Sequence, residues 1–195
     1  MKNILALILV IGLSISLNAQ TVLFLDAGHG GKDPGGIAAS GVTEAEINQL
    51  FVKEIKELAE AKGMKVVLLS KSDTYISLKE RVGQANDYKL EKGQKAILLS
   101  IHANFSPADP LKKGKEVLVM RKEERSKGSM ELANKFSKAL DAPILEKGLT
   151  ILRQANMPAV MIETGYLSNE QDAIDLTTPD MRTVLVRKIV ATLTQ

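Results

Sequence analysis

The stretch Val22-Leu23-Phe24-Leu25-Asp26-Ala27-Gly28-His29-Gly30-Gly31 joins a run of four apolar residues to a glycine-rich turn that carries a histidine. Four consecutive apolar residues predict a β-strand that is buried on both faces. The glycines around His29 allow the backbone to turn sharply and to come close to a ligand. In open α/β sheets, ligands bind at the carboxyl ends of the strands, which is where this turn lies.

Outward from this stretch, apolar runs alternate with amphipathic segments. Further strands are predicted at Val66–Leu69, Ala96–Ile101, Glu116–Met120, Leu149–Leu152 and Ala159–Ile162. Helices are predicted at Thr43–Lys62, Ser77–Leu90, Arg125–Leu140 and from Pro179 to the C-terminus. Capping boxes, Thr43 with Glu46 and Ser77 with Glu80, open the first two helices. Buried strands separated by helices predict a single α/β domain, with a mostly parallel, twisted sheet flanked by helices.

The composition excludes several classes of protein. The chain has 195 residues, of which 45% are hydrophobic and 25% charged, so collagen-like, coiled-coil and disordered proteins are excluded. It contains no cysteine, which excludes a disulfide framework, a zinc finger and a cysteine nucleophile. The net charge is only +3 and Lys and Arg form no block, so no nucleic-acid partner is expected.

The N-terminus has the pattern of a secretory signal peptide. Lys2 precedes the apolar run Ile4–Leu13, which extends to Leu17 and is followed by Asn18-Ala19. The run is short for a membrane-spanning helix, which needs about 20 apolar residues. We therefore predict a signal peptide at 1–19, a catalytic domain at 20–195, no stable membrane anchor, and export to the periplasm or the cell exterior. The alternatives are an uncleaved anchor or a buried first helix.

The chain has only two histidines, His29 and His102, and each is predicted to follow a buried strand. Because parallel strands end at one edge of a sheet, the two imidazoles are expected to converge there. Two histidines, a carboxylate and an open position make up a catalytic zinc site. Glu46 is better explained as a capping residue, whereas Glu44 fits a ligand and a first-turn acid favoured by the helix dipole equally well. Alternatively, both histidines are incidental polar residues of loops.

Glu163 follows Val160-Met161-Ile162, a run without a polar residue. A carboxylate at the end of so apolar a run is expected to be paired, ligating or catalytic, because a lone buried charge is unfavourable. Beside a metal and its water, such a glutamate would serve as a general base. The alternative is a structural salt bridge.

Several segments, in order, resemble the zinc-dependent N-acetylmuramoyl-L-alanine amidases of the amidase_3 type. They are Asp26–Gly35, Gly41–Asn48 with Glu44, Ser77–Asn86, Ser100-Ile101-His102-Ala103-Asn104 and Pro158–Asn169. The resemblance extends from Val22 to about Leu176, nearly the whole mature chain. The departures are mild: for example, Ala27 stands where the family usually has proline.

The resemblance implies a Zn²⁺ ion held by His29, Glu44 and His102, with Glu163 as the catalytic acid and base. The implied reaction is hydrolysis of the amide between N-acetylmuramic acid and L-alanine, in peptidoglycan or in released muropeptides. Asn104, beside His102, is a candidate for substrate binding, although a simple turn residue is the favoured interpretation. The ligand set by itself also permits other divalent metals.

Two other functions remain open: a different zinc hydrolase of the stem peptide, and a non-catalytic regulator that binds the cell wall. We expect a monomer that needs no activator. His102 and Glu163 are separated by only 60 residues, most of which the fold uses. The remaining Asn104–Lys115 contains Pro107, Pro110 and Gly114, a pattern too broken for a regulatory helix that would block the site.

Overall fold

The computed structural model describes residues 20–70, 73–122 and 126–195. The predicted signal peptide at 1–19 lies outside them. Among the helices of the described ranges, none has the length and apolar character that a membrane span requires.

Six strands form one sheet in the order β2-β1-β3-β6-β4-β5. The strands are β1 (Thr21–Ala27), β2 (Lys65–Leu68), β3 (Lys95–Asn104), β4 (Glu116–Val119), β5 (Ile144–Glu146) and β6 (Ala159–Tyr166). The pairs β2–β1, β1–β3 and β3–β6 are parallel, whereas β4 is antiparallel to β6 and β5 follows the direction of β4. The predicted α/β fold is confirmed as a mixed sheet in which parallel pairs predominate.

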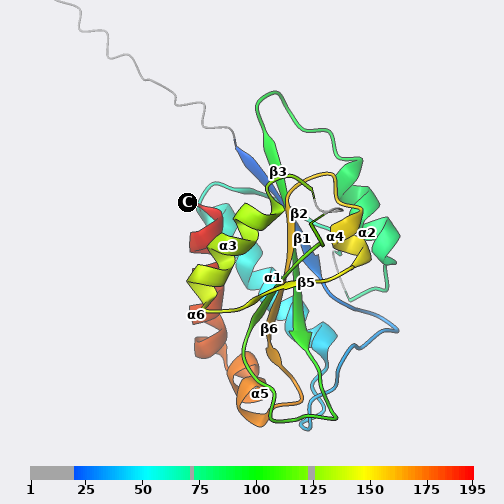
Figure 1. The fold of residues 1–195 in the computed structure, drawn as a ribbon, viewed down its shortest axis with the longest axis vertical. Coiled ribbons are helices and arrows are strands. Elements are labelled where there is room, and N and C mark those ends of the chain that lie inside the picture. Colours follow the sequence, from blue (N-terminus) through cyan, green and yellow to red (C-terminus); the bar gives the residue numbers. More distant parts are fainter. Residues whose placement is uncertain (1–19, 71–72, 123–125) are drawn as a thin grey trace, which may run out of the picture.

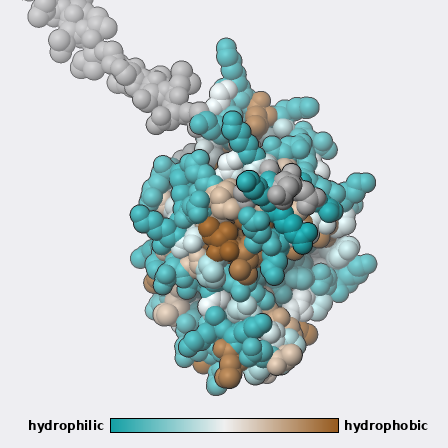
Figure 2. Space-filling model, in the orientation of Figure 1, coloured by the Kyte–Doolittle hydropathy of each residue, from teal (hydrophilic) through white to brown (hydrophobic). Residues whose placement is uncertain are grey.

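Helices cover both faces of this sheet (Figure 1). They are α1 (Glu44–Ala61), α2 (Leu78–Asn86), α3 (Ser129–Leu140), α4 (Thr150–Arg153), α5 (Glu170–Thr177) and α6 (Pro179–Leu193). Helices α1, α3 and α6 pack on one face, around a core that includes Phe51, Phe136 and Ile189. Helices α2 and α4 pack on the other face, over a smaller core with Phe24 and Leu98. Hydrophobic side chains that remain at the surface gather near the middle of the side shown in Figure 2.

Both predicted capping boxes are present, and they set the starts of α1 and α2. Helix α2 ends at Asn86 and not at Leu90, the predicted end. The helix stops there because Asn86 and the residues after it make tertiary contacts instead of continuing the helix. The Asn86 side chain donates to the carbonyl of Gln154 and accepts from the backbone N–H of Asn156. Shortly beyond, the ring of Tyr88 packs edge-on against Phe24, at 5.3 Å between centroids.

The prediction of a strand at Leu149–Leu152 is wrong, because these residues begin α4. A run of four apolar residues does not distinguish a strand from a short buried helix. Here Ile151 and Leu152, within α4, contribute to the smaller core that α2 and α4 cover. Strand β5 and helix α5 were not predicted. Helix α3 begins at Ser129 because the preceding Gly128 has a left-handed backbone conformation, with φ of +88°; Arg125 lies outside the described residues.

His102 and Glu163 lie within strands and not after them, which corrects the predicted boundaries. Strand β3 continues to Asn104 and β6 to Tyr166, with a register shift between His102 and Asn104. The two residues pair directly across β3 and β6. Their side chains therefore point to the same face of the sheet.

Candidate metal centre

Three residues that are distant in the sequence meet at the carboxyl end of β1 and β3. His29 lies in the turn after β1, Glu44 is the first residue of α1, and His102 lies near the end of β3. One nitrogen or oxygen from each of them lies within 4.8 Å of the others. The predicted convergence of the two histidines is therefore present, and Glu44 joins them.

The turn brings His29 and His102 together because Gly28 leaves room for an imidazole. A Cβ atom at Gly28 would lie only 2.2 Å from the His102 ring, so any other residue there would push the ring away. His29 itself has a left-handed backbone conformation, with φ of +63°, which is unusual for a residue with a side chain. The two rings stand edge to face, with centroids 5.1 Å apart.

The Glu44 carboxylate occupies the centre of the cluster. Its Oε1 atom is 3.1 Å from His29 Nε2 and 2.9 Å from His102 Nδ1. The backbone N–H of Gly36 donates to its Oε2 at 3.0 Å. The Glu44 side chain thus points into the cluster. Glu46, in contrast, is exposed, and its carboxylate accepts a hydrogen bond from the backbone N–H of Thr43, as the capping box predicts.

The charges of the cluster stabilise one another. Burial opposes the ionisation of Glu44, but the hydrogen bonds with His102 and His29 outweigh it and hold the Glu44 pKa well below its usual range. The hydrogen bond with Glu44 is the main cause that raises the pKa of His29 to about 9, and burial opposes this shift. When His29 is protonated, its imidazolium proton occupies the position that a bound cation would take. Binding of a metal would therefore release this proton.

Asp33 is a member of the site that the sequence analysis did not single out. Its carboxylate lies 2.9 Å from His29 Nδ1, which leaves Nε2 directed towards Glu44. Carboxylates in this position orient metal-binding histidines and fix their tautomer. Its spacing of four residues from His29, in the same glycine-rich segment, was the signal that could have identified it.

Glu163 lies beside the cluster in an apolar setting. Its Oε2 atom is buried and has no hydrogen-bond partner among the residues that the structure describes. Burial raises the Glu163 pKa to about 7; the negative charges of Glu44 and Glu116 add to this shift, and His102 opposes it. A carboxyl group with a pKa near neutrality accepts and donates protons readily, which is the property required of a general acid and base.

A groove of about 400 Å³ lies beside the two histidines of the cluster and Glu163. Its polar lining is formed by His29, Asp33, Arg81, His102, Thr150 and Glu163. Its apolar lining comes from Tyr75, Ile76, Leu78, Leu118, Leu149, Ile151 and Met161. The two histidines of the cluster and Glu163 thus border a groove whose lining combines polar and apolar side chains.

Asn104 is not among the residues that line this groove. Its side-chain amide donates to Glu116 Oε2 at 3.2 Å, and the hydroxyl of Tyr166 donates to Glu116 Oε1 at 2.7 Å. Glu116 pairs with Glu163 across β4 and β6. The antiparallel strand β4, whose direction the sequence did not reveal, brings this second carboxylate close to Glu163.

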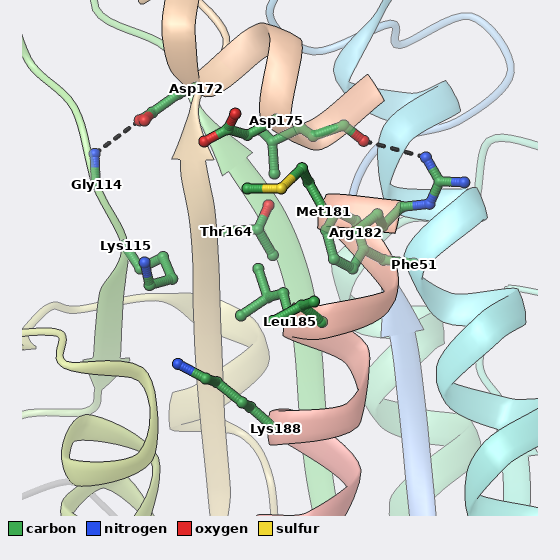
Figure 3. Close-up of a pocket in the computed structure, with 12 residues that line it drawn as sticks. Phe51, Gly114, Lys115, Thr164, Asp172, Asp175, Met181, Arg182, Leu185 and Lys188 are labelled. Atoms are coloured by element: carbon green, nitrogen blue, oxygen red, sulfur yellow. Dashed lines mark hydrogen bonds between the residues drawn. The ribbon is translucent and has the colours of Figure 1, made fainter. Parts of the chain in front are cut away.

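A second cavity, of about 160 Å³, lies between β6, α5 and α6, on the face of the sheet opposite the cluster (Figure 3). The side chains of Thr164, Met181 and Leu185 line it, and the backbone N–H of Gly114 donates to Asp172 at its rim. Within the described ranges, no cluster able to hold a metal lies there, because the His29–Glu44–His102 group is the one found.

The donors of the first site suit a metal ion. Two imidazole nitrogens and one carboxylate oxygen are the ligands of many catalytic zinc sites, which keep a further position open for water or substrate. The groove supplies that open side. An α/β domain with such a cluster and an adjacent, half-buried glutamate has the groups that a metal-dependent hydrolase needs.

The chain belongs to the N-acetylmuramoyl-L-alanine amidase family, because the model of that family, Amidase_3, matches residues 23–195. It is 30% identical to the N-acetylmuramoyl-L-alanine amidase LytC of Bacillus subtilis over 161 residues, which are 79% of this chain and 31% of LytC. It is also 30% identical to the probable cell wall amidase LytH of Staphylococcus saprophyticus, over 89% of this chain and 57% of LytH. The chain thus spans about a third to just over half of these curated relatives.

Solved structures show the same fold. The N-acetylmuramoyl-L-alanine amidase from Clostridium difficile 630 is 31% identical, with a TM-score of 0.80, and the match covers 90% of this chain and 95% of that one. The catalytic domain of CwlV, an N-acetylmuramoyl-L-alanine amidase from Bacillus (Paenibacillus) polymyxa, is 29% identical, with a TM-score of 0.79. That match covers 90% of this chain and 96% of the CwlV domain.

Proposed function

We propose that this chain hydrolyses the amide bond between the lactyl group of N-acetylmuramic acid and the L-alanine of the stem peptide in peptidoglycan, with a bound Zn²⁺ ion. The observation that carries the proposal is the Oε2 atom of Glu163, which is buried, has no hydrogen-bond partner among the described residues and lies beside the His29–Glu44–His102 cluster. Membership of the amidase family and the likeness to relatives named as cell wall amidases supply the substrate class.

In the proposed mechanism His29, Glu44 and His102 hold the metal. A zinc ion in such a site supplies Lewis acidity, which polarises a carbonyl and makes water a stronger acid. Asp33 keeps His29 Nδ1 occupied, so that His29 offers Nε2. Glu44 is ionised and its Oε1 is already directed at both histidines, so little reorganisation is required.

Glu163 carries the proton in this proposal. Its free Oε2 accepts a proton from the attacking water and then delivers it to the departing amine of L-alanine. The raised pKa supports both roles, because the ionised form accepts the proton and the neutral form donates it near pH 7. The apolar side chains of the groove offer contacts to the rest of the substrate.

We also propose that residues 1–19 are a signal peptide, that residues 20–195 are the catalytic domain, and that the protein acts as an exported monomer on the cell wall. The family relationship to cell wall amidases supports the place of action.

The decisive experiment is product analysis. Mature protein is incubated with purified peptidoglycan in the presence of Zn²⁺, and the products are identified by mass spectrometry. We expect intact stem peptides that begin with L-alanine and glycan chains with free lactyl carboxylates. Cleavage within the stem peptide would favour the alternative hydrolase. A metal-loaded protein that releases nothing would instead support a wall-binding regulator.

We further propose that the site is open without an activator. Residues 105–115, all of them described, form no helix or strand, and α3 packs on the sheet through Ala133, Phe136 and Leu140 instead of plugging the groove. Purified residues 20–195 should therefore be active alone, and deletion of Ser106–Lys113 should not raise the rate. A parent protein that is inactive until this deletion is made would contradict the proposal.

A further inference from the structure

The guanidinium group of Arg81, in α2, contacts the backbone of the His29 turn directly. Nη2 donates to the carbonyl of His29 at 2.6 Å, and Nη1 donates to the carbonyl of Ala27. Nε donates to the carbonyl of Ile76 at 2.8 Å, so the same group also holds the loop before α2. Arg81 is only 2% exposed, although it borders the groove.

A buried carboxylate fixes this guanidinium in place. Arg81 Nη1 lies 3.0 Å from Asp26 Oδ1, and the hydroxyl of Ser100 donates to Asp26 Oδ2 at 2.6 Å. Asp26 is fully buried. Because Asp26 belongs to β1, Ser100 to β3 and Arg81 to α2, the network joins the strands that carry the site to a helix outside the sheet.

The backbone that Arg81 holds is the one that needs a restraint. His29 has a left-handed conformation, which is unfavourable for a residue with a side chain. Without the guanidinium, the carbonyls of Ala27 and His29 would lose a charged donor, and the turn would relax towards ordinary dihedral angles. A change in φ at His29 moves its imidazole, and with it the spacing to Glu44 and His102.

We propose that Arg81 is a positioning residue for the metal centre: it holds the His29 turn in the strained conformation that aims Nε2 at Glu44. The inference rests on the proposed metal site and assigns Arg81 no contact with the metal or the substrate.

The chain contains a matched control in Arg182, on the other side of the sheet (Figure 3). Arg182 is 6% exposed, and its Nε lies 2.7 Å from Glu54 Oε1. Its Nη1 donates to the carbonyls of Leu176 and Thr177 at 3.2 and 3.4 Å. It therefore has the burial, carboxylate partner and backbone contacts of Arg81 without a contact to the His29 turn.

The test compares Arg81→Lys with Arg182→Lys in the mature chain. Lysine keeps the charge but not the planar fork that reaches several carbonyls at once. We expect both variants to fold with a lowered melting temperature. In titrations with Zn²⁺ in a competing chelator, Arg81→Lys should bind about 10–100-fold more weakly than the wild type, a range typical for loss of a residue that orients a ligand. Arg182→Lys should bind like the wild type.

A second pair of variants, Asp26→Asn and Glu54→Gln, changes the carboxylate partners of the two arginines. Each substitution retains a side chain of similar shape. A loss of Zn²⁺ affinity is expected for Asp26→Asn and not for Glu54→Gln, and this pair decides the matter if Arg81→Lys does not fold. Wild-type affinity in a folded Arg81→Lys, or equal losses in both pairs, would overturn the role of Arg81. A wild-type chain that binds no Zn²⁺ would contradict the proposed metal site itself and, with it, this inference.

Discussion

The two faces of the sheet use the same strands for different purposes. On the face covered by α1, α3 and α6, β3 presents Leu99, Ile101 and Ala103, all fully buried. On the face covered by α2 and α4, the alternate residues Leu98, Ser100 and His102 change from apolar to polar towards the carboxyl end. Strand β6 shows the same contrast, with Ile162 on the first face and Glu163 on the second.

This difference shows how one strand can stabilise the fold and also carry chemistry. Successive side chains of a strand point to opposite faces, so a polar residue on one face leaves the hydrophobic packing of the other intact. The apolar residues of the face covered by α1, α3 and α6 should therefore determine stability. The polar residues at the carboxyl end of the other face, together with His29 and Glu44, should determine metal binding and catalysis.

The largest effect on catalysis is expected for Glu163→Gln. Glutamine keeps the shape but transfers no proton, so the rate of hydrolysis should fall about 10²–10⁴-fold while Zn²⁺ remains bound. The rate is measured on peptidoglycan, and the metal content by elemental analysis. Glu54→Gln, on the opposite side of the sheet, serves as the control with normal activity. Near-normal turnover by Glu163→Gln would remove Glu163 from the mechanism.

The opposite result is expected for Phe136→Ala, in α3. Phe136 is fully buried, and its truncation leaves a cavity that should lower the free energy of unfolding by about 3–5 kcal/mol. The folded fraction should bind Zn²⁺ as tightly as the wild type does. Urea denaturation measures the first quantity and metal titration the second. A weakened Zn²⁺ affinity would show that the two faces are coupled.

A smaller effect is expected from the charge of Glu163 in the metal-free protein. Its pKa is raised from 4.5 to about 7, so the folded state prefers the neutral carboxyl group. The resulting stability is complete below about pH 4.5 and is lost as the pH rises through about 7. Each unit of pKa shift corresponds to about 1.4 kcal/mol.

Glu163→Gln should not show this loss, because glutamine does not ionise. Between about pH 4 and pH 8, the melting temperature of the variant in chelator should therefore rise relative to that of the wild type. A difference that stays constant with pH would mean that Glu163 ionises in the fold as readily as it does in water.

The smallest effect is expected from metal removal on the fold. His29, Glu44 and His102 come from three elements, two of them anchored in the apolar core, and hydrogen bonds hold the cluster without a metal. A chelator should abolish activity but leave the far-UV circular dichroism spectrum unchanged. An unfolded protein after chelation would assign the metal to the stability of the fold.

The sequence alone was sufficient for the elements whose signals are local. The apolar runs predict β1, β3 and β6, and the capping boxes predict the starts of α1 and α2, because side chains within three residues satisfy the first backbone N–H groups. The convergence of His29 and His102 also followed, since neighbouring parallel strands end at the same edge. The resemblance to a family then favoured a role for Glu44 as a metal ligand over its alternative role as a first-turn acid that interacts with the helix dipole.

Only the tertiary structure revealed what depends on contacts between distant segments. Asp33 and Arg81 join the site through the folding of the His29 turn, and Glu116 approaches Glu163 because β4 runs antiparallel to β6. The residues Leu149–Leu152 have the apolar pattern of a strand, but their burial beside α2 makes them the start of a helix. The raised pKa of Glu163 likewise arises from burial. Burial is the sum of all packing around a residue, so no short stretch of sequence encodes it.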